Sequence, residues 1–405
     1  MAEALAINTV KKGELPHYEP YGWQHWPDFP WLSYQFRRAL GETQEGGGSV
    51  SELLLAASRM KPGDLDSWHE ELLKVSDNNM QRGDAEAAKG HFRTAMNCWL
   101  RAADMYRSAE FWLTHDDPRR LPTFDKCEQA THKFLAHLVP KGEVVLVPYE
   151  GKHLFAYFIS APYRAPQKKP VLIAFGGLDS FKDELWFMVG RGALQRGISV
   201  LMVDGPGQGG TLRRLGIPTR YDYEVPVGAC IDWLATRQDV DMSRIAVSGS
   251  SLGGYYAARA GAKEPRLAAA IAHGAQWDVG ARMRERDDDH MLARHLRWVF
   301  GGKTMKEVWE ISKPFKLEGV LDSMKCPFLI CHGGHDVLGV QTAGIVYDYA
   351  KKVGVDVTLR VVTEEETGAD HCQHDNPTIG QELMLDWLAD RFGIDQRTLR
   401  NDQPL

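Results

Sequence analysis

Short runs of consecutive apolar residues recur along the chain after Gly142, and this feature limits the possible folds more than any other. Most are separated by longer amphipathic stretches, and the runs are Val144–Val147, Leu154–Ile159, Val171–Phe175, Ile198–Val203, Ile245–Val247, Leu267–Ala272, Phe328–Cys331 and Val357–Val362. A strand with one solvated face alternates polar and apolar residues, whereas a strand covered on both faces is apolar throughout. The pattern therefore predicts an α/β fold with a mostly parallel, doubly wound sheet between two layers of helices.

The chain before Lys141 has a different texture, which predicts helices. An aromatic, proline-punctuated opening is too irregular for one long element, and we expect it to lie over another surface; it contains Tyr18, Tyr21, Trp23, Trp26, Phe29, Trp31 and Tyr34. Between Asp64 and Leu113 apolar residues recur with the helical period, and Gly83-Asp84 predicts a break between two helices. A helical domain packed on its neighbour is the favoured interpretation. A peptide-binding repeat module is the alternative, although the sequence holds no second copy at that period.

The apolar pattern is interrupted again between Asp278 and Ser323. A charged run over Glu285–His290 leads into an amphipathic stretch at Met291–Phe300, and the interval is too long for an ordinary loop, so we expect an insertion with its own helices. The predicted organisation is a helical N-terminal (cap) domain over residues 1–141, an α/β core over 142–277 and 323–405, and a helical cap insertion over 278–322.

Composition limits the partners of the chain. With 405 residues, 43% of them hydrophobic and 25% charged, the chain resembles a soluble globular protein larger than one ordinary domain. A nucleic acid or an anionic membrane would require a basic patch, but the net charge is −6 and no Lys/Arg block is present. Met1–Val10 lacks a signal-peptide-like apolar run, and the six cysteines lack the spacing of a disulfide scaffold. We expect a cytoplasmic protein that binds neither nucleic acid nor membrane.

The segment from Ile245 to Gly254, Ile-Ala-Val-Ser-Gly-Ser-Ser-Leu-Gly-Gly, carries the chemistry. Gly-x-Ser-x-Gly occurs often by chance, but here an apolar strand precedes it and a small-residue helix follows, as in a nucleophile elbow. Such a turn holds the serine in a strained conformation, and Gly249 and Gly253 are needed because a side chain there would collide with a neighbouring strand or helix. Ser250 is one position too early, so Ser251 is the predicted nucleophile. A glycine-rich turn with a capping serine is the alternative.

A serine nucleophile needs a base that an acid orients, and in this fold the order along the chain is Ser, acid, His. Asp336 follows the apolar run Phe328–Cys331 and a glycine turn, so it is the predicted acid. His371 follows the next strand and is the predicted base. The competing residues are His374 for the base and Asp356 and Asp370 for the acid, and both aspartates are expected to be structural.

The same two segments contain enough donors for a metal ion, because histidine is the commonest metal ligand. The candidate ligands are His332, His335, Asp336, His371 and His374. A nucleophile elbow in the same chain already explains an acid and a histidine at these positions. We therefore expect neither a metal nor a cofactor, and activity that resists chelators would exclude the metal-dependent interpretation.

Acyl transfer also requires hydrogen-bond donors for the developing oxyanion. One predicted donor is the backbone N–H of Leu252, directly after the nucleophile. The other lies in the turn Phe175-Gly-Gly-Leu-Asp179, where Gly177 is the first choice and Leu178 the alternative. This turn lacks both the dinucleotide fingerprint and the P-loop Lys-Ser/Thr, which disfavours a phosphate site. Asp204-Gly-Pro-Gly-Gln-Gly209 is interpreted as a rigid turn that shapes the floor of the site without a catalytic duty.

Taken together, these motifs resemble one group of α/β-hydrolases. The motifs are Phe-Gly-Gly-Leu-Asp-Ser, Asp-Gly-Pro-Gly-Gln-Gly, Gly-Ser-Ser-Leu-Gly-Gly, His-Gly-Gly-His-Asp and Asp-His-Cys-Gln-His. The group includes 2,6-dihydroxypseudooxynicotine hydrolase, fungal heptaketide-shortening hydrolases of melanin pathways and relatives of the fermentation-respiration switch protein. The resemblance covers the chain from Gly142 onward and, more loosely, Asp84–Leu113. It implies a Ser251–Asp336–His371 triad, a site capped jointly by the N-terminal helices and the insertion, and a homodimer.

The predicted function is that of a serine hydrolase acting on a moderately bulky, aromatic or polyketide-like small molecule. Members of the group cleave either esters or a C–C bond adjacent to a ketone, and both remain open here. A C–C hydrolase would need a further polar group from the cap, for which Asp278, Arg282 and Glu285 are the candidates. The alternatives are a non-catalytic partner-binding protein on a hydrolase scaffold and an acyltransferase that uses the same acyl-enzyme.

Overall fold

The fold is organised around one eight-stranded sheet with the order β1-β2-β4-β3-β5-β6-β7-β8. The computed structural model describes residues 25–162, 168–178 and 180–399. The strands are β1 (Glu143–Tyr149), β2 (Lys152–Ile159), β3 (Lys169–Phe175), β4 (Ser199–Asp204), β5 (Val240–Ser250), β6 (Ala269–His273), β7 (Phe328–Gly333) and β8 (Val357–Val362). Strands β3 to β8 are parallel, and only the β1–β2 hairpin and its pairing with β4 are antiparallel. The mostly parallel α/β sheet predicted from the apolar runs is confirmed.

The central strands β3, β4, β6 and β7 are buried on both faces, which explains why they are continuously apolar. At the edge of the sheet, Val144 and Leu146 of β1 are exposed, so the two-sided burial predicted for that run is wrong. On β5, Val247 belongs to the core on one face and its neighbour Ala246 to the core on the other. One face packs against α8 (Glu224–Ala235), α9 (Leu252–Lys263) and α13 (Val340–Lys352), and the other against α6 (Arg191–Gln195) and α14 (Pro377–Arg391). A short helix, α7 (Gly209–Leu215), follows β4.

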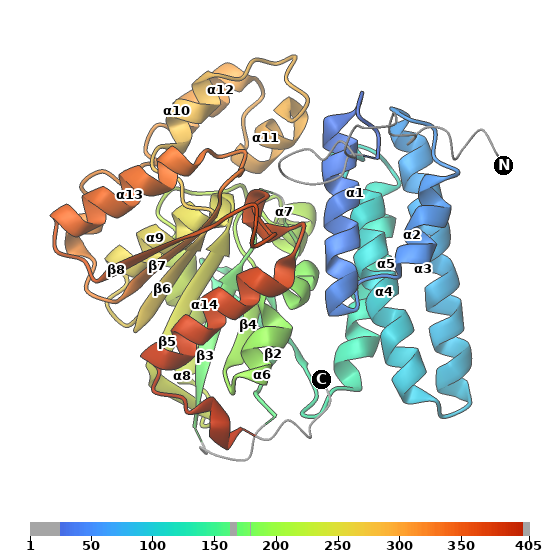
Figure 1. The fold of residues 1–405 in the computed structure, drawn as a ribbon, viewed down its shortest axis with the longest axis horizontal. Coiled ribbons are helices and arrows are strands. Elements are labelled where there is room, and N and C mark those ends of the chain that lie inside the picture. Colours follow the sequence, from blue (N-terminus) through green and yellow to red (C-terminus); the bar gives the residue numbers. More distant parts are fainter. Residues whose placement is uncertain (1–24, 163–167, 179, 400–405) are drawn as a thin grey trace.

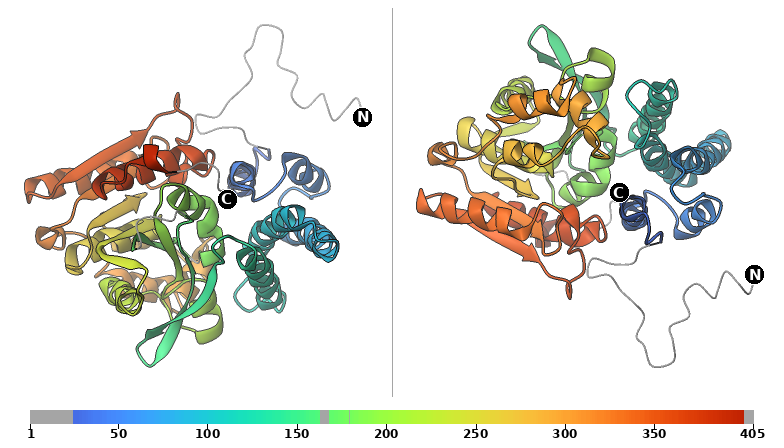
Figure 2. Two further views of the ribbon diagram at one scale, coloured as in Figure 1. Left: turned by 90° about the horizontal axis from the view of Figure 1, so that it is seen from below. Right: turned by 90° about the horizontal axis from the view of Figure 1, so that it is seen from above.

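Within the described residues, α-helices α1 to α5 precede the sheet and lie beside it (Figures 1 and 2). They are α1 (Pro30–Glu42), α2 (Val50–Ala57), α3 (Leu65–Ala88), α4 (Phe92–Glu110) and α5 (Arg120–Ala136). In the part of the chain that the structure describes, the aromatic opening is not one element: the chain before Pro30 forms turns, and proline at the first position then starts a regular helix that carries Trp31 and Tyr34. Met1–Val10, Tyr18, Tyr21 and Trp23 lie outside the described residues.

The predicted helix break at Gly83-Asp84 is also wrong. Helix α3 continues through both residues and ends near Gly90, whose φ of 83° is left-handed. A Cβ atom on Gly83 would lie 2.7 Å from Cδ1 of Trp99 in α4. The missing side chain at Gly83 therefore lets two long helices approach each other closely.

The interval after β6 forms helices of its own, as predicted. These are α10 (Val279–Arg284), α11 (Ala293–Phe300) and α12 (Met305–Ser312), which lie together at one end of the sheet in Figure 1. Leu296 and Phe300 of α11 are buried in the same core as α9. The remaining short helical turns are η2 (Thr43–Glu45), η3 (Lys182–Glu184), η4 (Trp186–Gly190), η5 (Leu321–Ser323), η6 (His371–Gln373) and η7 (Gln396–Thr398).

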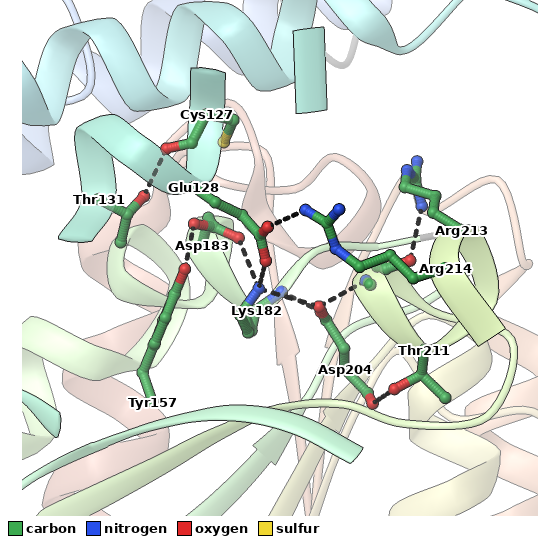
Figure 3. Close-up of polar contacts among 12 residues, drawn as sticks. Cys127, Glu128, Thr131, Tyr157, Lys182, Asp183, Asp204, Thr211, Arg213 and Arg214 are labelled. Carbon is green, nitrogen blue, oxygen red and sulfur yellow. Dashed lines mark hydrogen bonds and ion pairs between the residues drawn. The ribbon is translucent and has the colours of Figure 1, made fainter. Parts of the chain in front are cut away.

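A buried ion-pair cluster joins the N-terminal helices to the sheet (Figure 3). The Nζ atom of Lys182 lies 2.5 Å from Glu128 of α5, 3.1 Å from Asp204 at the end of β4 and 3.4 Å from Asp183. Burial lowers the pKa of Lys182, but the three carboxylates raise it above its usual value. Tyr157 of β2 donates a hydrogen bond to Asp183 at 2.9 Å. The cluster fixes the segment between β3 and β4 in the interior.

All six cysteines are buried and free. None of the helices in the described part of the chain is both long and apolar enough to cross a bilayer.

Candidate active site

Ser251 stands at a sharp turn between β5 and α9, where an elbow is predicted. Its φ of 59° and ψ of −116° are strained for a residue with a side chain, and its N–H donates to the His273 carbonyl at 2.8 Å. A Cβ atom on Gly249 would lie 2.0 Å from the Gly253 carbonyl oxygen, and one on Gly253 would lie 2.4 Å from that of Gly176. Glycine is therefore required on both sides of Ser251 for this turn to form.

Asp336 and His371, which are far apart in sequence, are brought into contact behind the carboxyl ends of β7 and β8. His371 Nδ1 lies 2.7 Å from Asp336 Oδ1, which also accepts a hydrogen bond from the Leu338 N–H at 2.7 Å. Burial raises the pKa of Asp336, but the attraction of His371 lowers it below its usual range. Burial lowers the pKa of His371, whereas the Asp336 charge raises it well above its usual value. The pair is thus arranged so that the imidazole readily accepts a proton at its other nitrogen.

The competing acids and the competing histidine have other contacts. Asp370 is paired with Arg37 at 2.7 Å and accepts the backbone N–H of His371 at 2.8 Å, so it caps η6 and helps to position His371. Asp356 is exposed and paired with Arg391. His374 packs edge-on against Tyr34, with the ring centroids 6.2 Å apart.

The histidines of the two segments do not gather around one point. In the described part of the chain, the donor atoms that lie within 4.8 Å of one another belong to Asp336, His371 and Cys372. His335 instead faces Glu364 at 3.3 Å, and His332 Nε2 lies 3.9 Å from Asp336. Since Asp336 and His371 are already hydrogen-bonded to each other, this arrangement fits an acid–base pair directly.

The glycine turn after β3 lies against Ser251, as expected for an oxyanion site. A Cβ atom on Gly177 would be 2.8 Å from Cβ of Ser251. However, the N–H of Gly177 donates to Ser180 Oγ at 2.9 Å, so it is engaged within its own turn. Leu178, which follows Gly177, and Leu252 at the start of α9 both line the cavity that Ser251 also lines. Asp179 lies outside the described residues.

The turn at Asp204–Gly209 holds the glycine turn in place from below. The Gln208 amide donates to the carbonyl oxygens of Gly176 at 2.6 Å and of Gly177 at 3.0 Å. Burial raises the pKa of Asp204 to about 6, and its carboxylate accepts the backbone N–H of Gly210 at 2.7 Å. The interpretation as a rigid structural turn agrees with these contacts, and Gln208 is the positioning residue that the sequence did not single out.

Ser251 and His371 line a cavity of about 440 Å³. The N-terminal helices and the insertion both contribute walls, which include Trp31, Tyr34, Arg37, Phe111, Arg282, Met283, Arg286, Leu292, Leu296 and Phe300. Of the three cap candidates for a polar group, only Arg282 lines the cavity. Asp278 instead caps α10 by accepting the Ala281 N–H at 2.7 Å, and Glu285 is exposed outside the cavity lining.

Comparison with known proteins assigns the family. Residues 192–395 match the prolyl oligopeptidase family. The chain belongs to this family of α/β-hydrolases. Among curated proteins, 20-hydroxy-prefusarin hydrolase FUS2 of Gibberella moniliformis is 31% identical over 74% of this chain and 81% of its own length. Hydrolase LUC6 of a Fusarium species is 29% identical over 90% of this chain and 97% of its own.

The solved structures agree with the fold and with the resemblance seen in the sequence. The crystal structure of 2,6-dihydroxy-pseudo-oxynicotine hydrolase superimposes with a TM-score of 0.75 and 27% identity, covering 90% of this chain and all (100%) of that one. This match includes the N-terminal helices as well as the sheet, because 90% coverage extends well beyond residues 192–395. The chain is therefore an α/β-hydrolase enzyme with the helical additions of that group.

Proposed function

We propose that this enzyme is a serine hydrolase that cleaves an acyl bond through a covalent acyl-enzyme. The observation that carries the proposal is the Asp336–His371 hydrogen bond of 2.7 Å beside a cavity that Ser251 also lines. An elbow serine, a histidine and a buried carboxylate in the order Ser, Asp, His form the machinery of α/β-hydrolases. The family match supports the same assignment.

In the proposed reaction, Ser251 Oγ attacks the substrate carbonyl carbon while His371 takes the hydroxyl proton at Nε2. His371 then donates this proton to the leaving group, and a water molecule hydrolyses the ester formed on Ser251 by the same route. Asp336 keeps the imidazole oriented through Nδ1 and stabilises its cationic form. No cofactor takes part in these steps.

The oxyanion is proposed to bind the backbone N–H groups of Leu252 and Leu178. Leu252 is the first residue of α9, where backbone N–H groups are free of intrahelical partners. We place the second donor at Leu178 in preference to Gly177, because the Gly177 N–H already serves Ser180. Gly177 contributes instead by letting the turn approach Ser251 closely.

The proposed substrate is a moderately bulky aromatic or polyketide-like molecule, cleaved at an ester or at a C–C bond adjacent to a ketone. A volume of about 440 Å³ lies within the usual range for small-molecule sites, roughly 300–1,000 Å³. Trp31, Phe111 and Phe300 supply aromatic walls. 20-Hydroxy-prefusarin hydrolase FUS2 and 2,6-dihydroxy-pseudo-oxynicotine hydrolase are both named for small organic substrates.

A fluorophosphonate probe and a product assay test the proposal. The unmodified chain and Ser250→Ala should both be labelled at Ser251, whereas Ser251→Ala should be neither labelled nor active while it keeps its circular dichroism spectrum. Products from a panel of aryl esters and a panel of acyl ketones then identify the bond. Unchanged turnover in Ser251→Ala would refute the mechanism.

We also propose a cytoplasmic homodimer. The resemblance to the hydrolase group supports the dimer, and six buried free thiols suit a reducing compartment. Light scattering coupled to gel filtration measures the mass in solution, and a monomer at micromolar concentration would contradict the dimer.

A further inference from the structure

Two arginines of the cap insertion face the active-site cavity without an acidic partner. Five arginines line the cavity. Three belong to the N-terminal helices, namely Arg37, Arg38 and Arg107, and two belong to the insertion, namely Arg282 and Arg286. The three arginines of the N-terminal helices are paired with three buried carboxylates, those of Asp370, Glu42 and Glu184. Within the described ranges, no carboxylate lies at ion-pair distance from Arg282 or Arg286.

The two guanidinium groups differ in how they are held. Arg282 donates to the Leu338 carbonyl at 2.9 Å, and the Leu338 N–H in turn donates to Asp336, so Arg282 is tied to the loop that carries the proposed acid. The side chain of Arg286, which follows the end of α10, makes no hydrogen bond to the described residues; its backbone carbonyl accepts from Trp309 and its backbone N–H donates to Met283. Arg286 is therefore the cation free to bind a ligand.

Charge and burial make an anion the expected ligand. Both arginines are partly buried, and burial lowers the pKa of each guanidinium. Repulsion from Arg282 lowers the pKa of Arg286 further, and the exposed Glu285, which is not at ion-pair distance, offsets only part of this. A partly desolvated cation without a counter-ion is unfavourable, and the planar guanidinium matches a two-oxygen anion through paired hydrogen bonds. Among the described residues that line the cavity, Asp370 is the one acidic side chain, and it already forms an ion pair with Arg37.

We propose that Arg286, supported by the charge of Arg282, binds a delocalised oxyanion on the substrate. The chemistry is that of two oxygens sharing one negative charge, as in a carboxylate or in the enolate of a 1,3-dicarbonyl. This inference rests on the proposed function for the place of the reacting carbonyl near Ser251. The binding itself requires no turnover, so it can be measured separately.

Binding to the Ser251→Ala protein tests the inference with unreactive pairs of ligands. One arm compares 4-phenylbutanoate with 4-phenylbutanamide by calorimetry. The other compares, in the same way, 2-acetylcyclohexane-1,3-dione with its 2-methyl derivative, which has no hydrogen between the carbonyl groups and so stays neutral. A charge-assisted hydrogen bond to the anion predicts that at least one anion binds about tenfold to a hundredfold more tightly than its neutral partner. The arm that shows the preference distinguishes carboxylate from enolate.

Three variants on the Ser251→Ala background locate the preference. Arg286→Gln should abolish it, and Arg286→Lys should keep part of it, because lysine retains the charge without the planar fork. Arg284→Gln is the matched control, since Arg284 is an exposed arginine at the end of α10, two residues before Arg286 and outside the cavity lining, and it should leave the preference intact. In the Ser251→Ala parent protein, added salt should weaken the binding of the anionic ligand and leave the binding of the neutral ligand unchanged.

Equal binding of anion and neutral partner in both arms would overturn the inference, as would a full preference retained in Arg286→Gln. If Arg286→Gln does not fold, the salt response of the Ser251→Ala parent decides the question. Failure of the proposed function is distinguishable, because it would appear as absent fluorophosphonate labelling of Ser251 while the anion preference persists.

Discussion

Replacing Lys182 with methionine removes the cation that three buried carboxylates share in Figure 3. Glu128 keeps its ion pair with Arg214, and Asp204 keeps backbone donors, so part of the negative charge stays compensated. Removing one partner of a buried ion pair generally costs about 3–5 kcal/mol, because the remaining charge is left desolvated. Lys182 is 1% exposed, so little solvent screening reduces this cost. We expect the free energy of unfolding to fall by about 3–5 kcal/mol at neutral pH.

Urea denaturation followed by tryptophan fluorescence and circular dichroism measures this loss. Lys313→Met is the matched control, because the Lys313 side chain is 58% exposed and its pair with Glu310 lies on the surface, where such pairs contribute at most about 1 kcal/mol. Adding Glu128→Gln to Lys182→Met should recover part of the loss by removing one stranded charge. Equal denaturation midpoints for Lys182→Met and Lys313→Met would refute the reasoning.

The deficit of Lys182→Met should also depend on pH. Burial already raises the pKa of Asp204 to about 6 in the folded protein, and loss of the lysine removes a charge that lowers it. A carboxyl whose folded-state pKa is raised binds its proton more tightly when folded, so it destabilises the fold above that pKa. This destabilisation disappears as pH falls below the unfolded value near 3.8. The difference between variant and parent should therefore shrink between pH 7 and pH 4, and a constant difference would contradict the stranded-charge explanation.

Three further predictions concern the site and the packing of the helices. The Asp336 charge raises the pKa of His371, and a general base must be neutral, so kcat/KM should rise with pH above pH 6.5. Asp336→Asn should lower kcat/KM and shift this rise to a lower pH. Gln208→Ala should lower kcat about tenfold with little change in KM, measured on an aryl ester, because it releases the turn that carries the proposed oxyanion donor; an unchanged kcat would show that the turn keeps its conformation without Gln208. Gly83→Ala should destabilise the protein by about 1–3 kcal/mol through overlap with Trp99. The helical control Gly344→Ala, where a Cβ meets nothing within 4 Å, should instead stabilise it by up to about 1 kcal/mol, and matching shifts in the two melts would count against close packing at Gly83.

The sheet was predictable because its strands carry their environment in their own residues. Val247 and Ala246 of β5 are both apolar since each faces a helix layer, so the continuous run reports burial on both sides. The elbow was predictable for a similar reason, because Gly249 and Gly253 exist only to permit the turn around Ser251. Burial of a strand and the backbone conformation of a tight turn both restrict the residues at those same positions, so they can be recognised in the sequence.

Features that depend on a distant partner left no such pattern. Gly83 resembles a helix break in the sequence, but its meaning comes from Trp99 on the next helix. The engagement of the Gly177 N–H depends on how Ser180 turns back, and the support from Gln208 depends on the meeting of two loops. A glycine at position 177 is equally compatible with a backbone N–H that binds the oxyanion and with a turn that must approach Ser251 closely, so the sequence could not separate the two roles.

The arrangement of charges separates the work of the core from that of the cap. Around Ser251 the core carries a buried acid that is already hydrogen-bonded to His371, so the proposed reacting centre has its polar partners without the substrate. The insertion, in contrast, presents Arg286 without a counter-ion within the described chain, so charge balance on that side is completed only when a ligand binds. A hydrolase built in this way would keep its bond-breaking chemistry when the insertion changes, while its choice of substrate would change with the charge at this position.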